Sequence, residues 1–344
     1  MTLRTVEMDF EYMNYIQEPP RKPHELMSQA CSNDRITIES WRKIWLDNIE
    51  YNHKTYGPFS SSHIGSLYEK HLMKPVIVAG SGPSLKVNIE HLKGNRDIPI
   101  ISCLHNFAYF EDRDINVDLY VTLDAGDIVL QDLYEGGQHD LDWYSERTKD
   151  KTLCAFIGTS RKLLEKWQGK ILWFNAPIPD PGIIDTVAKI EKFQCYVSNG
   201  GNVLGACLYI AKAFCAASTI AFIGADFSFD YKKKFHAWDN HYDINMGHTM
   251  RAVDVWGNKV LTWSSYWNFK NWFDFISLTV PGFWVNCAEG GCMGAYPDGN
   301  LITIKQMALK DFIDQFYIHE KIKQQALDPA NGIDPEVGQI KLLF

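Results

Sequence analysis

Short apolar segments that alternate with helical segments are the feature that most constrains the fold of this chain. From residue 74 onward, apolar runs of four to six residues are separated by amphipathic stretches. The runs are 75–79, 99–104, 119–123, 153–157, 171–174, 220–223 and 283–286. Strands this short and this uniformly apolar are typical of a parallel sheet that is covered by helices on both faces. We therefore predict an α/β fold: a Rossmann-like, doubly wound, mostly parallel sheet with an N-terminal helical extension.

The segments before and after the predicted sheet indicate two extensions. Trp41, Trp45 and Ile49 recur at helical spacing in the N-terminal part, and Gly57-Pro58 ends that pattern. We predict a helical N-terminal extension at 1–72, a Rossmann-like catalytic or nucleotide-binding domain at 73–300, and a C-terminal helix and tail at 301–344.

Three local predictions concern the connections. A prolyl stretch at 19–23 is expected to be a stiff connector, and a short helix is expected over Ser62–Met73. The segment Phe227–Trp263 is polar and aromatic without clear periodicity, which favours a long irregular binding loop or lid. The closing helix is expected over Ile304–Gln325.

Composition narrows the functional classes. The net charge of −8 argues against a broad nucleic-acid-binding face. No apolar run approaches the roughly 20 residues of a membrane span, and the first residues do not resemble a secretory signal. The eight cysteines include no C-x-x-C pair, which favours buried free thiols in a reducing compartment. We therefore expect a cytoplasmic protein without a permanently bound cofactor.

The first motif that could carry chemistry is V-A-G-S-G-P-S-L at residues 78–85. Gly80 and Gly82 follow a strand and open a helix, which favours the close approach of a phosphate to backbone N–H groups. Ser81 and Ser84 add hydroxyl donors. The alternative is a tight turn that needs glycine for steric reasons only, and no Walker-type lysine follows.

The second motif is S-N-G-G-N at residues 198–202, directly before an apolar helix. Asn199, Gly200, Gly201 and Asn202 place small and amide-bearing residues at a helix N-terminus, which favours an anion or a carboxylate. Asn202 is equally suited to cap the helix.

Acidic and imidazole side chains follow other predicted strands. Asp124 and Asp127 come after one strand and Asp226 after another, where open α/β sheets hold their ligands. These carboxylates could bind a metal ion, a ribose hydroxyl or a proton, and helix capping is the alternative for the first two. His236 and His241 in the irregular segment could serve as a general acid or base near neutral pH.

The last predicted strand ends in N-C-A-E-G-G, which contains Glu289 and Gly290. The glycine pair permits unusual backbone angles. We include Glu289 and Gly290 among the candidate binding residues.

Taken in order, these motifs resemble those of a known group. The set V-A-G-S-G-P-S-L, T-L-D, S-N-G-G-N, I-G-A-D-F, F-H-A and N-C-A-E-G-G looks like the bacterial motility accessory factor family. Its conserved domain is shared with archaeal 6-hydroxymethylpterin diphosphokinases. The resemblance covers roughly residues 70–295. The G-S-G-P-S-L and G-A-D-F pieces also resemble bacterial sialyltransferases that use CMP-sialic acid.

The resemblance implies transfer of a nonulosonic or sialic acid from a CMP-sugar to a protein or glycan acceptor. In that case residues 80–84 and 199–202 hold the nucleotide and the sugar acid. Asp124 binds ribose or orients the acceptor, and His236 or His241 acts as acid or base with Asp226 nearby.

Two alternatives remain open at this stage. The archaeal enzymes imply transfer of diphosphate from ATP to a pterin-like alcohol, with Mg²⁺ held by Asp124, Asp127 and Asp226. A binding module for a nucleotide or a sugar, without turnover, is the third class. The sequence does not assign an oligomeric state.

Overall fold

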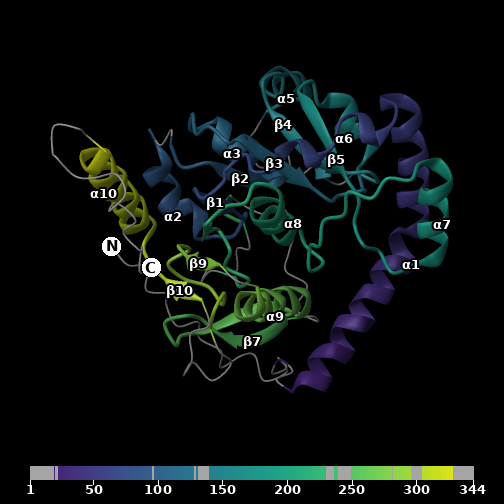
Figure 1. Ribbon diagram of the computed structural model, residues 1–344. Helices are drawn as coiled ribbons and strands as arrows, with labels where there is room; N and C mark the ends of the chain where they lie inside the picture. The colour runs from purple at the N-terminus through teal and green to yellow at the C-terminus, as the bar shows by residue number, and fades with distance from the viewer. Residues whose placement is uncertain are drawn as a thin grey trace.

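The molecule is built around one eight-stranded parallel sheet. The computed structural model describes residues 19, 22–94, 97–127, 129–130, 139–229, 236–238, 249–280, 282–295 and 304–327. Within this part, the strand order is β10-β9-β6-β1-β2-β3-β4-β5, and every neighbouring pair is parallel (Figure 1). The strands are β1 (Pro75–Ala79), β2 (Ile100–Cys103), β3 (Leu119–Thr122), β4 (Thr152–Phe156), β5 (Lys170–Phe174), β6 (Thr219–Ile223), β9 (Phe283–Asn286) and β10 (Lys305–Gln306). The predicted Rossmann-like α/β fold is confirmed.

The apolar runs form strands because both faces of the sheet are covered. Successive side chains of a strand point to opposite faces, so uninterrupted burial requires a helix layer on each side. In β1 the residues from Val76 to Ala79 are all fully buried, and all four residues of β2 and of β3 are buried as well. Hydrophobic patterning alone therefore located the central strands to within one or two residues.

The order of the strands reverses between β1 and β6. From β1 the chain adds β2 to β5 on one side, and then returns to place β6, β9 and β10 on the other side. In open α/β sheets such a reversal leaves a crevice beyond the carboxyl ends of the two diverging strands. The turns that follow β1 and β6 meet there.

Helices flank the sheet, as Figure 1 shows. One of them, α8, packs across β1, β2 and β3 and continues as a π-helical turn over Ile210–Phe214. The helices after the first are α2 (Leu85–Asn88), α3 (Phe107–Glu111), α5 (Leu141–Arg147), α6 (Arg161–Lys166), α7 (Pro181–Ile190), α8 (Val203–Tyr209), α9 (Ser264–Thr279) and α10 (Leu309–Leu327). No helix among the described residues is long and apolar enough to cross a membrane.

The N-terminal helix α1 (Pro23–Tyr56) begins well before the Trp41–Ile49 pattern that predicted it. The proline at its first position starts the helix instead of belonging to a separate connector, because a first-turn residue needs no N–H partner. The helix packs against α6, α7 and α9. The buried amide of Asn48 donates to the carbonyls of Ala125 (3.0 Å) and Gly158 (3.1 Å), and Asn52 bonds the loop after β4 in the same way. These bonds hold α1 against the loops at the carboxyl ends of the strands.

The predicted irregular segment Phe227–Trp263 is in part regular, which corrects that prediction. Its second half forms an antiparallel hairpin of β7 (Thr249–Val253) and β8 (Lys259–Trp263). The turn is set by Asp254, whose carboxylate accepts hydrogen bonds from the backbone N–H groups of Trp256 and Asn258. This is an Asx-type turn, and its signal D-V-W-G-N was not recognised in the sequence.

One other local prediction was wrong, and another was confirmed except for its first residues. Ser62–Met73 contains the 3₁₀ turn Ile64–Leu67 in place of an α-helix, and the nearby Phe59–Ser61 is a second such turn. The closing helix α10 begins at Leu309, because Lys305–Gln306 first pair with β9 at the edge of the sheet. Pairing to an existing sheet edge is a tertiary effect that helical periodicity does not report.

Candidate functional site

A cavity of about 360 Å³ lies where the strand order reverses. Its walls come from the turns after β1, β2, β3 and β6, from the start of α8 and from the start of α9. The cavity brings together these predicted site residues: Gly80, Ser81, Gly82, Asp124, Gly201, Asn202, Asp226 and His236. Residues up to 189 positions apart in the sequence, Gly80 and Phe269, thus share one space.

The turn after β1 is packed tightly against the turn after β6. The N–H groups of Gly80 and Gly82 donate to the carbonyls of Ile223 and Gly224, each at 2.8 Å. A Cβ atom on Gly82 would lie 2.2 Å from an Asp226 carboxylate oxygen, and one on Gly80 would lie 2.5 Å from the Gly224 carbonyl oxygen. Both glycines are therefore required for close packing, and their N–H groups are already engaged within the protein.

Ser84 and Asp226 connect these two turns through their side chains. Ser84 is buried, and its hydroxyl donates to the Asp226 carboxylate at 2.8 Å, while its N–H lies 3.3 Å from both carboxylate oxygens. Behind Asp226, a Cβ on Gly291 would meet its backbone at 2.5 Å, and the N–H of Cys292 donates to its carbonyl at 2.6 Å. Asp226 thus holds the β1 and β6 turns together.

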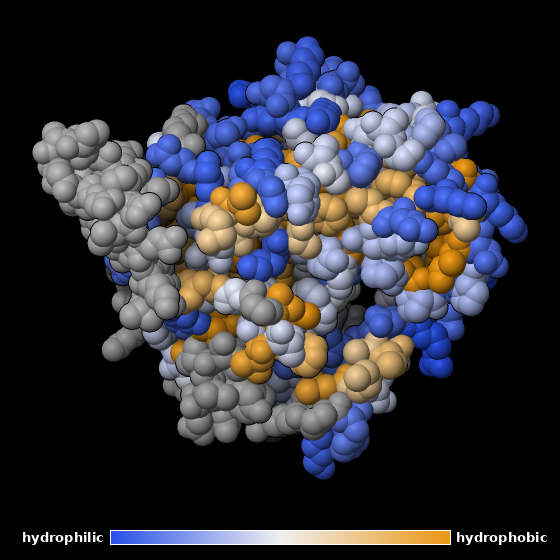
Figure 2. All heavy atoms as spheres, viewed as in Figure 1, coloured by the Kyte–Doolittle hydropathy of each residue, from blue (hydrophilic) through white to orange (hydrophobic). Residues whose placement is uncertain are grey.

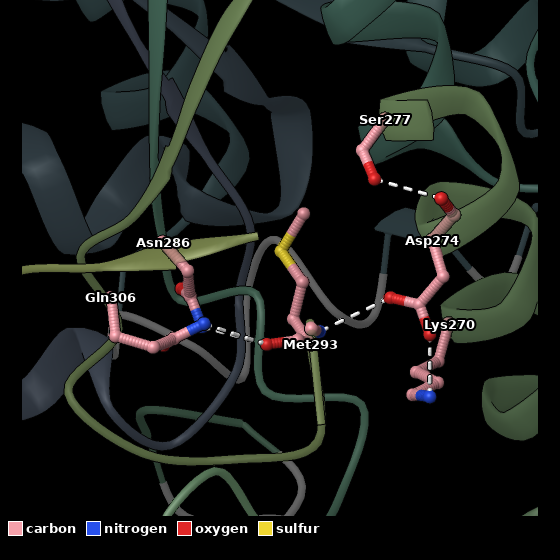
Figure 3. A network of polar contacts seen from close by, with 7 residues as sticks. Lys270, Asp274, Ser277, Asn286, Met293 and Gln306 are labelled. Carbon is pink, nitrogen blue, oxygen red and sulfur yellow. Dashed lines mark hydrogen bonds and ion pairs between the residues drawn. The ribbon is translucent and has the colours of Figure 1, made fainter. Parts of the chain in front are cut away.

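The loop behind Asp226 is itself anchored by a polar network (Figure 3). The buried Lys270 and Asp274 of α9 form an ion pair with an N···O distance of 2.5 Å. The other Asp274 oxygen accepts the N–H of Gly294 at 3.2 Å. The side-chain amides of Asn286 and Gln306 both donate to the carbonyl of Met293 at 3.2 Å. The loop after β9 is in this way tied to α9 and to β10.

Glu289 and Gly290 do not line the cavity. Glu289 has a positive φ of 61°, and its carboxylate accepts the N–H of Leu309 at 3.2 Å, at the start of α10. Gly290 has no atom within 4 Å of the position where a Cβ would stand. The contacts of Glu289 are those of a helix cap, and a binding role for the two residues stays a prediction.

The turn before α8 differs from the turn after β1. Gly200 and Gly201 have φ values of 57° and 83°, which favour glycine. The Asn202 side chain accepts the N–H of Gly205 at 2.9 Å and caps the helix, as the alternative interpretation held. Asn199 accepts the N–H of Gly201 at 2.8 Å, and Asn199 and Gly200 line a neighbouring cavity instead of this one.

Sequence reasoning missed His105, which lies next to Asp124 in the cavity. Its Nε2 is 3.5 Å from an Asp124 carboxylate oxygen. Burial alone would raise the pKa of Asp124, but the hydrogen bond and charge of His105, together with Thr122, outweigh it and leave the pKa below its usual value. His105 comes two residues after the end of β2 and directly after the predicted strand at 99–104, and this position was the signal that could have identified it.

His236 lies over the turn after β1. The N–H of the next residue, Ala237, donates to the carbonyl of Ser81 at 3.0 Å. The imidazole stacks on Trp238 with ring centroids 4.9 Å apart, and its centroid is 6.3 Å from that of His105. Burial is the main cause that lowers the pKa of His236 to about 3, and the charge of His105 is the second cause. The His236 ring is therefore neutral near pH 7. His241, the other predicted histidine, lies outside the described residues.

Asp127 is directed to other partners than Asp124. Its carboxylate accepts the Ser160 hydroxyl at 2.9 Å and pairs with Lys162 at 2.7 Å, and the Lys162 hydrogen bond is the main cause of its lowered pKa. It does not line the cavity. Among the described residues, no group of three or more His, Cys, Asp or Glu side chains is arranged to hold a metal ion.

Comparison with known proteins agrees with this architecture. A model of the family described as "6-hydroxymethylpterin diphosphokinase MptE-like" matches residues 43–232. The solved structure of the MAf glycosyltransferase from Magnetospirillum magneticum AMB-1 is similar, with a TM-score of 0.50 and 16% identity. The match covers 71% of this chain and 36% of that one, so the chain spans little more than a third of that protein. None of the curated proteins matches the sequence.

Proposed function

The chain belongs to the MptE-like family, and from that premise we propose that it transfers a sugar from a nucleotide-activated donor to a hydroxyl acceptor. The donor class that we favour is a CMP-linked nonulosonic or sialic acid. The observation that carries the proposal is the cavity at the strand reversal, because it joins an Asp124–His105 pair to the open N-terminus of α8.

Donor binding is assigned to the start of α8. Within the described residues, the N–H groups of Val203 and Leu204 have no acceptor, and both residues line the cavity. The N-terminus of a helix favours an anion through such N–H groups and through the helix dipole. The described walls contain no lysine or arginine, so a phosphate would meet neutral donors there, such as these N–H groups and the Ser81 hydroxyl.

Proton transfer is assigned to His105, oriented by Asp124. The acceptor hydroxyl gives its proton to the His105 imidazole, and its oxygen bonds to the anomeric carbon of the donor. The bond from that carbon to the phosphate oxygen breaks, and its electron pair leaves with the nucleotide. Asp124 stabilises the imidazolium that forms. His236 stays neutral because of its low pKa, which suits a hydrogen-bonding role better than that of a proton acceptor.

A ligand panel tests the donor class. Thermal unfolding is measured with CMP, CTP, CMP-sialic acid, AMP and ATP, each with and without Mg²⁺. A ligand at about 100 times its Kd adds roughly 2.7 kcal/mol to the stability of the folded state. At about 2–4 °C per kcal/mol, CMP-based ligands should raise Tm by several degrees without metal. No shift with any cytidine nucleotide would contradict the donor assignment.

His105→Asn tests the proton transfer. The variant should keep the Tm shift with CMP and lose about 10²–10⁴-fold in transfer rate, the usual contribution of a general base. His24→Gln, which changes an exposed histidine on α1, is the matched control. Unchanged turnover in His105→Asn would remove this residue from the mechanism.

Mg²⁺-dependent diphosphate transfer is the second candidate. The family description and the presence of Asp124 and Asp226 in one cavity favour it. The described donor set fits poorly, because Asp226 is bonded by Ser84 and Asp127 is paired with Lys162. A Tm shift with ATP and Mg²⁺ alone, abolished by EDTA, would establish this candidate. A binding module without turnover would show ligand shifts but no transfer in the wild type.

A further inference from the structure

A second cavity of about 590 Å³ lies between α1 and α9. Figure 2 shows a hollow on this face between the lower half of α1 and the body of the molecule. Its walls include Trp41 and Trp45 of α1 and Phe269 and Trp272 of α9, and we call it the aromatic chamber. Its volume lies within the roughly 300–1,000 Å³ of pockets that hold small organic ligands.

The aromatic chamber contains polar groups that the protein does not satisfy. Both side-chain amide atoms of Asn268 are buried there and have no hydrogen-bond partner in the part of the chain that the structure describes. Leaving a buried donor or acceptor unpaired destabilises the folded state. A ligand with both donors and acceptors would satisfy these groups.

The charges on the described walls of the aromatic chamber disfavour an anionic ligand. Its described walls contain two carboxylates, Asp34 and Asp124, and no lysine or arginine. Burial raises the pKa of Asp34, and its carboxyl oxygens can accept hydrogen bonds from hydroxyl groups. Indole faces, an amide and carboxyl oxygens without cations are the groups that suit a neutral, hydroxyl-rich ring.

The chamber and the site cavity share one wall. Leu123, Asp124, Gly201 and Phe269 line both. Asp124 therefore stands between the space beside the α8 N-terminus and the space beside the tryptophans. A ligand in the chamber would reach Asp124, whose carboxylate lies 3.5 Å from the His105 imidazole in the site cavity.

We propose that the aromatic chamber binds the acceptor of the transfer reaction, and that this acceptor is a neutral glycan. The inference rests on the proposed sugar transfer. In this proposal, α1 supplies part of the surface that binds the acceptor. Most of the α1 residues that line the chamber precede residue 43, where the family match begins. Acceptor choice would then be set by a segment outside the matched region.

Calorimetric titration of the full chain with maltotriose, lactose and chitobiose tests the proposal. The wild type should bind at least one of these neutral glycans. Trp41→Ala should raise its Kd tenfold or more, and Asn268→Ala should raise it about threefold. Trp256→Ala is the control, because Trp256 is 50% exposed and does not line the chamber. All three variants should keep the Tm shift with CMP.

The possible results separate this inference from the proposed function. Binding of none of the glycans by a wild type that binds CMP would overturn the chamber assignment alone. The chamber assignment would also be overturned if Trp41→Ala and Asn268→Ala both bound the glycan with wild-type affinity. It would be overturned as well if the chamber bound a planar pterin and no glycan. Chamber-dependent glycan binding without any cytidine-nucleotide shift would sustain the acceptor site and overturn the donor.

Discussion

Two glycine-containing turns look alike in the sequence and differ in the structure. Residues 80–84 and residues 198–202 each place glycines and small polar residues before a helix. In the first turn, the N–H groups of Gly80, Gly82 and Ser84 donate to the β6 turn. In the second turn, Asn202 caps α8, and the next N–H groups remain open to the cavity.

The difference shows that glycine before a helix does not by itself indicate an anion site. The first turn lies between two neighbouring strands and uses its glycines to let two backbones approach. The second turn uses glycines for positive φ and leaves the helix N-terminus exposed to the cavity. The first turn therefore serves to pack β1 against β6, and the second turn is the better candidate for binding a phosphate.

The largest expected effect is on the first turn. Gly82→Ala places a Cβ 2.2 Å from the Asp226 carboxylate and 2.8 Å from the Gly224 carbonyl oxygen. Overpacking of this kind costs about 3 kcal/mol or more, so Tm should fall by about 10 °C or the protein should become insoluble. Gly201→Ala, with φ of 83° and one ring atom at 3.1 Å, should cost about 1–2 kcal/mol.

Thermal unfolding monitored by circular dichroism compares these variants. Gly290→Ala is the neutral control, because nothing lies within 4 Å of its Cβ position. If Gly82→Ala were as stable as Gly290→Ala, the tight contact between the two turns would be refuted.

The second effect concerns His236, which covers the first turn. The pKa of a free imidazole is 6.5, and that of His236 is about 3 in the folded protein. Between these values the unfolded chain binds more protons, so stability should fall as the pH is lowered from 7 to 4. The contribution is at most about 1.4 kcal/mol per pH unit.

His236→Gln should remove that contribution. The Tm of this variant should fall less than the wild-type Tm between pH 7 and pH 4, while His24→Gln should follow the wild type. Parallel Tm curves for the wild type and His236→Gln would show that the folded protein does not suppress protonation of His236.

The smallest expected effect concerns the cap of α8. Asn202→Ala removes the bond to the N–H of Gly205 and should cost about 1 kcal/mol. Asn202→Asp keeps a capping oxygen and should keep Tm, but its charge should repel an anionic donor and raise the Kd for CMP several-fold. Equal CMP affinity in the wild type and Asn202→Asp would argue against donor binding at this helix.

Sequence patterns predicted the sheet well and the site in part. The predicted runs 75–79 and 220–223 correspond to β1 and β6, since strands buried on both faces must be apolar throughout. Asp124 and Asp226 were found because they follow the predicted strands at 119–123 and 220–223. The hairpin β7–β8 was missed because its turn depends on the Asp254 side chain, which periodicity does not detect.

The site as a whole could not be assembled from the sequence. His105 was not singled out, and the separation of Asp127 from Asp124 follows from Lys162 and Ser160, which lie more than 30 residues further along the chain. Strand order decides which strand ends are neighbours, and no local pattern encodes it.

The sequence by itself determined the parallel α/β architecture, because a strand that is buried on both faces must consist almost entirely of apolar residues. Only the tertiary structure decided which N–H groups and carboxylates remain available to a ligand. Gly82 and Ser84 are engaged by the β6 turn, while the start of α8 faces a cavity. Whether a polar group can bind a ligand depends on which distant segment packs against it, and this packing arises only when the chain folds.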